Sequence, residues 1–153
     1  MQYKLVEVNE ENYHLFDDMI YWRINGKERT DNEKKENTNN QIVPKELYNT
    51  NFHVFAIEIN NKFVAWISII YLPKVGKANC NGFIYVDELW VEESHRRLGL
   101  AKELMEKADE LCIRLNTVGI RLGVNVNNPS ALNLYEDCGY ISTGQAYTME
   151  KRM

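Results

Sequence analysis

The sequence predicts a mixed α/β fold in one domain, with a single sheet and helices on both of its faces. Runs rich in β-branched and aromatic residues alternate along the chain with longer segments of helical periodicity. The 153 residues fit one compact domain over residues 1–153, and 44% apolar with 26% charged residues is the composition of an ordinary globular protein. The expected order of elements is β-α-(α)-β-β-β-α-β-α-β-β, with no internal repeat.

The first part of the chain predicts a strand and a helix, followed by a polar segment. Residues 3–8 alternate apolar and polar side chains, and Asn9 is placed to cap a helix over about 10–24, where apolar residues recur at helical spacing. Residues 31–40 hold almost no apolar side chain, so we expect a mobile surface loop there. Pro44 is suited to the first turn of a short helix that follows.

The remaining elements follow from the same patterns. Asn60 and Asn61 separate two β-branched runs and predict a hairpin turn. Gly139 predicts the C-terminal cap of the last helix. The expected strands are 54–59, 63–70, 83–91, 120–126, 140–143 and 147–152, the expected helices are 98–115 and 130–137, and a break is expected at 79–82.

A short basic turn between a strand and a helix carries the clearest chemistry. The strand ends near Val91, and the turn into the helix reads Arg96-Arg97-Leu98-Gly99-Leu100-Ala101. A helix N-terminus offers unpaired N–H groups and partial positive charge to an anion, and Gly99 lets the backbone approach a diphosphate closely. Neither a Walker loop nor a dinucleotide fingerprint is present. On these residues alone, Arg96 and Arg97 are either phosphate ligands or a solvated basic pair.

A second segment, residues 125–140, joins this turn in a recognisable combination. It reads Asn-Val-Asn-Asn-Pro-Ser-Ala-Leu-Asn-Leu-Tyr-Glu-Asp-Cys-Gly-Tyr. The two segments together resemble the GNAT acetyltransferase family. The family pattern Arg/Gln-x-x-Gly-x-Gly/Ala falls on Arg96, Gly99 and Ala101, and its pattern Asn-x-x-Ala-x-x-x-Tyr-x-x-x-Gly-Phe/Tyr falls on Asn128, Ala131, Tyr135, Gly139 and Tyr140. The resemblance covers about residues 83–141, whereas the N-terminal half matches only in its order of elements.

The resemblance implies a GNAT acyl-CoA acyltransferase fold with acetyl-CoA as cosubstrate. The strands over 83–91 and 120–126 would diverge, and the pantetheine arm would pair with the backbone of residues 89–91 as an added strand. Asn128 would bond to the arm through its side chain. The residues assigned to coenzyme binding are Leu89, Trp90, Val91, Arg96, Arg97, Leu98, Gly99, Leu100, Ala101, Asn128, Ala131 and Leu134.

Two residues are candidates for catalysis. Glu88 shares strand parity with Ile84, Val86 and Trp90, so we expect its carboxylate on a mostly apolar face, where desolvation would raise its pKa and suit it to deprotonate an amine. The alternative is that Glu88 has no catalytic role and only pairs with a cation or faces solvent. By the resemblance, Tyr135 would protonate the departing thiolate, with a packed core aromatic as the alternative. The N–H of Val91 would polarise the thioester carbonyl.

The expected function is transfer of an acetyl group from acetyl-CoA to a primary amine, by direct attack in a ternary complex. The acceptor would be a small molecule or a protein amino group, and a non-catalytic acyl-CoA sensor or scaffold is the alternative. A toxin acting on aminoacyl-tRNA is disfavoured because the formal net charge is −4. In this family the region after the first helix commonly covers the acceptor, so Tyr21, Trp22, Glu28 and Tyr48, within or near residues 25–50, are candidate contacts.

The remaining expectations concern the setting of the protein. Its three cysteines are odd in number and widely spaced, which indicates reduced thiols and no metal site. No signal peptide or long apolar run is evident, so we expect a cytoplasmic protein without membrane contact. Exposed C-terminal strands would make a homodimer plausible.

Overall fold

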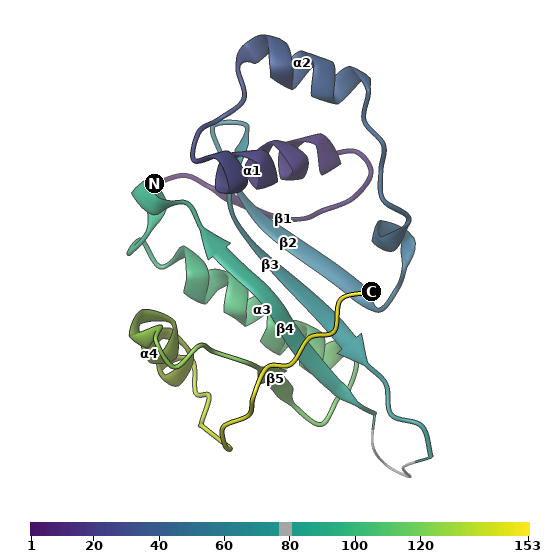
Figure 1. Cartoon of the computed structure of the whole chain (residues 1–153), viewed down its shortest axis with the longest axis vertical. Coiled ribbons are helices and arrows are strands. Elements are labelled where there is room, and N and C mark those ends of the chain that lie inside the picture. The colour runs from purple at the N-terminus through teal and green to yellow at the C-terminus, as the bar shows by residue number, and fades with distance from the viewer. Residues whose placement is uncertain (77–80) are drawn as a thin grey trace. The chain divides into compact units, whose positions relative to one another are not determined.

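The computed structural model describes residues 1–76 and 81–153 and confirms the mixed α/β fold (Figure 1). It divides into two compact units, Met1–Gly123 and Val124–Met153. The first unit holds a five-stranded sheet in the order β1-β2-β3-β4-β5. The strands are β1 (Lys4–Glu7), β2 (Phe52–Ile59), β3 (Lys62–Leu72), β4 (Phe83–Val91) and β5 (Ile120–Leu122). Neighbours from β1 to β4 run antiparallel, and β5 pairs parallel with β4. The break expected at 79–82 lies partly outside the described residues.

The first unit also carries the helices that cover this sheet. They are α1 (Tyr13–Asn25), α2 (Asp31–Asn39) and α3 (Leu100–Arg114), with short 3₁₀ helices at Lys45–Tyr48 and Glu93–His95. The hairpin turn between β2 and β3 is confirmed, because Asn60 and Asn61 have positive φ angles of 51° and 59°. Two consecutive residues with positive φ are what a tight hairpin turn needs, and asparagine tolerates that conformation better than most residues.

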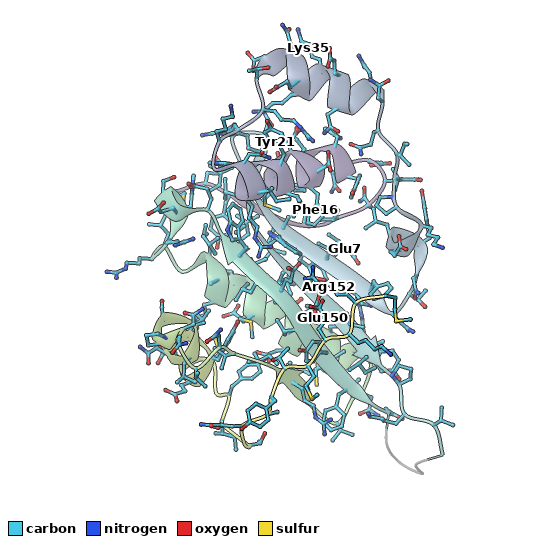
Figure 2. All side chains as sticks on the ribbon, viewed as in Figure 1. Glu7, Phe16, Tyr21, Lys35, Glu150 and Arg152 are labelled. Atoms are coloured by element: carbon cyan, nitrogen blue, oxygen red, sulfur yellow. The ribbon has the colours of Figure 1, made fainter. Side chains whose placement is uncertain are left out.

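Helices of the first unit cover both faces of the sheet. On one face lies α1, whose Phe16 meets the Trp66 ring edge-on at 5.1 Å between centroids, and Figure 2 labels this side chain. Strand residues of the opposite parity, such as Ile57 and Ile67, are fully buried, and α3 lies on that side of the sheet (Figure 1). The buried stripe of α3 is Leu100, Leu104, Met105, Ala108 and Leu111. Each fully buried Leu or Met contributes about 1.5–3 kcal/mol, so α3 is firmly held.

The polar segment expected as a mobile loop is instead the helix α2. Thr30 caps it in both directions: its side chain accepts a hydrogen bond from the N–H of Glu33, and the Glu33 carboxylate accepts one from the N–H of Thr30. None of the residues of α2 is buried. The helix therefore forms through its capping box and its polar contacts, and the shortage of apolar residues did not exclude a helix.

The second unit has a single regular element among its residues, the helix α4 (Pro129–Asp137). The strands expected over 140–143 and 147–152 are not present, and Figure 1 draws the chain after α4 without arrows. The strand expected over 120–126 is likewise reduced to Ile120–Leu122. A strand exists only where a partner supplies ladder hydrogen bonds, and an alternating sequence pattern does not show whether that partner is available.

Candidate active site

The basic turn connects the end of β4 to the N-terminus of α3. Arg97 and Gly99 both adopt left-handed backbone conformations, with φ of 61° and 84°. Glycine suits the second position, and the space that a Cβ would fill there is empty. The first intrahelical bond runs from the N–H of Glu103 to the carbonyl of Gly99, so the N–H groups at the start of α3 have no acceptor within the helix. The turn therefore presents backbone donors, which is the geometry expected of an anion site.

A buried carboxylate anchors the start of this turn. Glu92 has a relative exposure of only 9% and accepts hydrogen bonds from the backbone and hydroxyl of Ser94 and from Nδ1 of His95, the last at 2.6 Å. Burial alone would raise the pKa of Glu92, but the hydrogen bonds from Ser94 and His95 outweigh it and hold the pKa below its usual value. This cluster was not predicted, although the Glu-x-Ser-His spacing that forms it is present in the sequence.

Arg96 joins the turn to the end of β4. Its side chain is exposed, and its Nε donates a hydrogen bond of 3.0 Å to the carbonyl oxygen of Val91. Arg97 is exposed as well. Two residues assigned to coenzyme binding are thus in direct contact, and the guanidinium of Arg96 lies where the strand ends.

The last residues of β4 have an open edge. β5 pairs only with Ile84–Val86, while β4 continues to Val91. The N–H of Glu92 donates to the carbonyl of Val64 in β3, so by alternation the N–H groups of Leu89 and Val91 point to the other side, away from β3. The backbone of Trp90 points toward β3. Of the three residues expected to pair with the pantetheine arm, Leu89 and Val91 have the required backbone direction, and Trp90 does not.

A bulge in β4 corrects the expected surroundings of Glu88. Ser68 of β3 lies opposite Glu88 and Ile69 lies opposite Val86, so Asp87 is an extra residue in β4. Val86 therefore faces α3, whereas Glu88 faces α1. The predicted shared parity of Glu88 with Ile84 and Val86 is wrong, whereas its shared parity with Trp90 is confirmed. The carboxylate has a side-chain exposure of 45%, so the desolvated setting expected for it is wrong too.

An aromatic and charged surface surrounds Glu88 on the α1 side of the sheet. We call the side chains of Trp22, Arg23, Trp66, Glu88 and Trp90 the acceptor face. Nη1 of Arg23 lies 3.5 Å from the Glu88 carboxylate, and its guanidinium carbon lies 5.8 Å from the centre of the Trp66 ring. The rings of Trp22 and Trp90 meet edge-on at 6.4 Å between centroids. Trp22 was predicted from the sequence as a candidate contact, whereas Arg23 belongs to no motif and was not.

The other candidate contacts of the acceptor are already engaged with neighbouring side chains. The guanidinium of Arg29 stacks over the ring of Tyr21 at 4.6 Å, and the hydroxyl of Tyr48 donates to Glu10 at 2.8 Å. The carboxylate of Glu28 accepts hydrogen bonds of 2.8 Å from both Lys34 and Lys62. Burial alone would raise the pKa of Glu28, but these two lysines outweigh it and lower the pKa. The negative charge of Glu28 is therefore already balanced by these two lysines.

The second unit contains the other site residues, on α4 or at its start. The side chain of Asn128 caps this helix by accepting a bond of 3.1 Å from the N–H of Ala131, so its Oδ1 is occupied and its Nδ2 is left for other partners. Ala131, Leu134 and Tyr135 are half-buried. Burial, and then the nearby Cys138, raise the pKa of Tyr135, which keeps its phenol protonated at neutral pH.

No group of three or more potential metal-ligating side chains is found within residues 1–76 and 81–153, and Cys80 lies outside them. No helix in these ranges has both the length and the apolar character that crossing a membrane requires.

Comparisons with known proteins agree with this geometry. A family model described as "Acetyltransferase (GNAT) family" matches residues 12–140. The chain belongs to the GNAT acetyltransferase family. A curated relative is the chloroplastic GCN5-related N-acetyltransferase 4 of Arabidopsis thaliana, 36% identical over 93 residues, which are 56% of this chain and 32% of that protein. The chain thus spans about a third of the length of this relative.

Two solved structures share the fold. An aminoglycoside acetyltransferase from an uncultured soil metagenomic sample, in complex with trehalose, has a TM-score of 0.76 at 18% identity and covers 99% of this chain and 96% of its own. An aminoglycoside N-acetyltransferase in complex with CoA has a TM-score of 0.73 at 11% identity and covers 98% of this chain and 100% of its own. At these identities the likeness concerns the fold.

Proposed function

We propose that the protein transfers an acetyl group from acetyl-CoA to a primary amine. The observation that carries the proposal is the junction of β4 with α3. There, an open strand edge at Leu89 and Val91 leads directly into a turn with Arg96, Arg97 and free helix N–H groups. An edge that accepts an added strand and a turn that accepts a diphosphate are the two features that coenzyme A requires. Membership of the GNAT family and a CoA-bound relative of the same fold support the same coenzyme.

The residues of the junction fit the coenzyme, each through a different part of the ligand. The backbone of Leu89 and Val91 would pair with amide groups of the pantetheine arm, as an edge strand pairs with a neighbour. The diphosphate would lie at the start of α3, with Arg96 and Arg97 supplying charge-assisted hydrogen bonds. In the second unit, Asn128 would offer Nδ2, and Ala131 and Leu134 would leave room for the arm. When bound, acetyl-CoA supplies the acetyl group as a reactive thioester.

The chemical roles proposed for the side chains follow from the needs of amide formation. An alkyl ammonium, with a pKa of about 10.4, must lose a proton before its nitrogen can attack. Glu88 is the proposed acceptor of that proton. As the new C–N bond forms and the C–S bond breaks, the N–H of Val91 would stabilise charge on the carbonyl oxygen. Tyr135 would donate a proton to the departing thiolate, a role that fits a phenol kept protonated by burial.

A catalytically silent acyl-CoA sensor or scaffold is the second candidate, and the observation in its favour is the ion pair between Glu88 and Arg23. The Glu88 carboxylate is paired with Arg23 in this structure and is therefore not free to meet an incoming ammonium. Both an acetyltransferase and a sensor would bind the coenzyme, but only the acetyltransferase would turn it over.

Acetyl-CoA thiol release with a panel of primary amines tests the proposal. We expect turnover by the wild type and a loss of about 100-fold in kcat for Tyr135→Phe, because general acid catalysis contributes about 10²–10⁴-fold. Tyr147→Phe is the matched control, since Tyr147 is exposed at 96%. Coenzyme A binding measured by calorimetry should be equal in all three proteins. Coenzyme binding without turnover on any amine would establish the sensor instead.

A further inference from the structure

We propose that the acceptor is an amine carrying a carboxylate within a few bonds of its nitrogen, and that Arg23 binds this carboxylate. The proposal rests on the proposed function and concerns the acceptor face: Trp22, Arg23, Trp66, Glu88 and Trp90. It names a substrate class of which α-amino acids and peptides with an N-terminal acidic residue are examples.

Arg23 is the cation that the fold places beside the proposed base. It lies in the last turn of α1, and its guanidinium contacts both the Glu88 carboxylate and the Trp66 ring. Packing over an aromatic ring restrains the plane of the guanidinium while leaving its N–H groups available. The side chain has an exposure of 38%, so a ligand can reach it.

The contact between Arg23 and Glu88 is weak enough to be exchanged. Its 3.5 Å separation is at the limit for a hydrogen bond, whereas Arg29 lies 2.8 Å from Asp17 and 2.7 Å from Asp18. An exposed ion pair of this kind contributes about 0–1 kcal/mol. A carboxylate that meets the guanidinium with two parallel hydrogen bonds would bind better than Glu88 does.

The charges around the acceptor face disfavour a polycationic acceptor. The carboxylates that α1 and the following turn present there are already neutralised: Asp17 and Asp18 by Arg29, and Glu28 by Lys34 and Lys62. Lys62 also lies over the Trp22 ring at 5.4 Å. A polycation would therefore meet Arg23 and Lys62, and the carboxylates described on α1 and the turn after it would offer no uncompensated charge.

An acceptor with its own carboxylate would compensate the charges of both Arg23 and Glu88. Its carboxylate would replace Glu88 on Arg23, and its ammonium would then meet a Glu88 that has lost its cation. The displaced Glu88 carboxylate would then be available to accept a hydrogen bond from that ammonium. Arg23 would exchange Glu88 for the carboxylate of the acceptor, and Glu88 would pair with its ammonium. The net charge of the acceptor face would be unchanged.

Paired acceptors test the proposal. Thiol release from acetyl-CoA is measured with L-alanine and L-alaninamide, with the dipeptide Asp-Ala and its counterpart Asn-Ala, and with the polycationic aminoglycoside kanamycin. We expect kcat/KM to be higher by about 10- to 100-fold for the member of each pair with the extra carboxylate, from the strength of hydrogen bonds between charged groups. Arg23→Gln should remove most of that preference by raising KM.

Arg114→Gln is the matched control, because Arg114 is an exposed arginine in the last turn of α3. It should keep the preference of the wild type. Faster turnover of kanamycin than of the carboxylate acceptors, or an unchanged preference in Arg23→Gln, would overturn the proposal and leave the proposed function standing.

A binding measurement separates the two proposals. N-acetyl-L-alanine, the product of one acceptor, is titrated into the coenzyme A complex and followed by calorimetry. Binding that Arg23→Gln weakens about tenfold or more, with no turnover on any amine, would support the carboxylate site and overturn the proposed function. Equal binding by wild type and Arg23→Gln would overturn the role of Arg23.

Discussion

The proposed diphosphate turn and the segment that carries α2 are held in place by different interactions. The turn rests on the buried Glu92 and leads into α3, whose apolar stripe is part of the core. The segment over residues 26–40 has no buried residue in its helix and is attached to α1 by Arg29 and Asn37. Apolar packing is insensitive to salt, whereas surface ion pairs are screened by it. We therefore expect added salt to loosen the α2 segment and to leave the turn in place.

The largest effect is expected from Gly99→Ala. A residue with a Cβ pays about 1–2 kcal/mol in the left-handed region, and the added methyl group occupies the space in front of α3. We expect the Kd for coenzyme A to rise about tenfold or more, measured by calorimetry.

Gly26→Ala is the control for this change. Gly26 has a φ of 69° and open space around it, so the backbone cost is similar, but it ends α1 far along the chain from the turn. It should lower stability without changing the Kd for coenzyme A. An equal loss of coenzyme affinity in both variants would show that the effect is general destabilisation and would remove the contrast between the two regions.

A smaller effect, on stability, is expected from Glu92→Gln. The hydrogen bonds of Ser94 and His95 favour the charged carboxylate, so its loss should cost about 1–3 kcal/mol at pH 7, measured by urea unfolding. Because the folded pKa is lowered, this stabilisation is present above the unfolded value of about 4.3 and disappears as the pH falls through the folded pKa. The difference between variant and wild type should shrink with acid. Glu93→Gln, an exposed neighbour, should show little change, and a pH-independent difference for Glu92→Gln would contradict the assigned charge.

The smallest effect is expected from Arg29→Gln, in the segment that carries α2. It removes contacts with Asp17 and Asp18 that tie the start of α2 to α1, at a cost of about 1 kcal/mol or less in global stability. Locally, amide hydrogen exchange over residues 31–39 should accelerate, and wild-type exchange there should rise with added salt. Lys35→Gln is the control, because Lys35 is exposed on α2 (Figure 2). Protection of α2 that neither the variant nor salt changes would contradict the proposed attachment.

Much of the fold was predictable because its signals are local. The hairpin turn at Asn60–Asn61, the helix start after Gly99 and the proline at the start of α4 each depend on a few adjacent residues. The helix α2 was equally local, since Thr30 and Glu33 have the spacing of a capping box. The low apolar content of residues 31–40 predicted a loop, but it does not exclude a helix whose first turn is capped in this way.

The errors concern interactions between distant parts of the chain. The bulge at Asp87 depends on how β4 aligns with β3, and no feature of the β4 sequence alone shows it. The expected strands after α4 needed partners that the pattern cannot reveal. Arg23 and Glu88 are 65 positions apart, so their contact appears only once the sheet is assembled. The roles assigned to Glu88 and Tyr135 stay predictions.

Because Asp87 is an extra residue, even-numbered side chains before and after it in β4 lie on opposite faces of the sheet. Before it, Ile84 and Val86 belong to the interior shared with α3; after it, Glu88 and Trp90 belong to the acceptor face. Under the proposed function, substitutions at these last two positions would alter substrate choice without disturbing the packing against α3. Deletion of Asp87 would make Val86 and Glu88 neighbours on opposite faces, so it would remove the bulge while keeping Glu88 and Trp90 on the α1 side of the sheet. For protein engineering, β4 is thus a strand whose second half can be redesigned independently of its first.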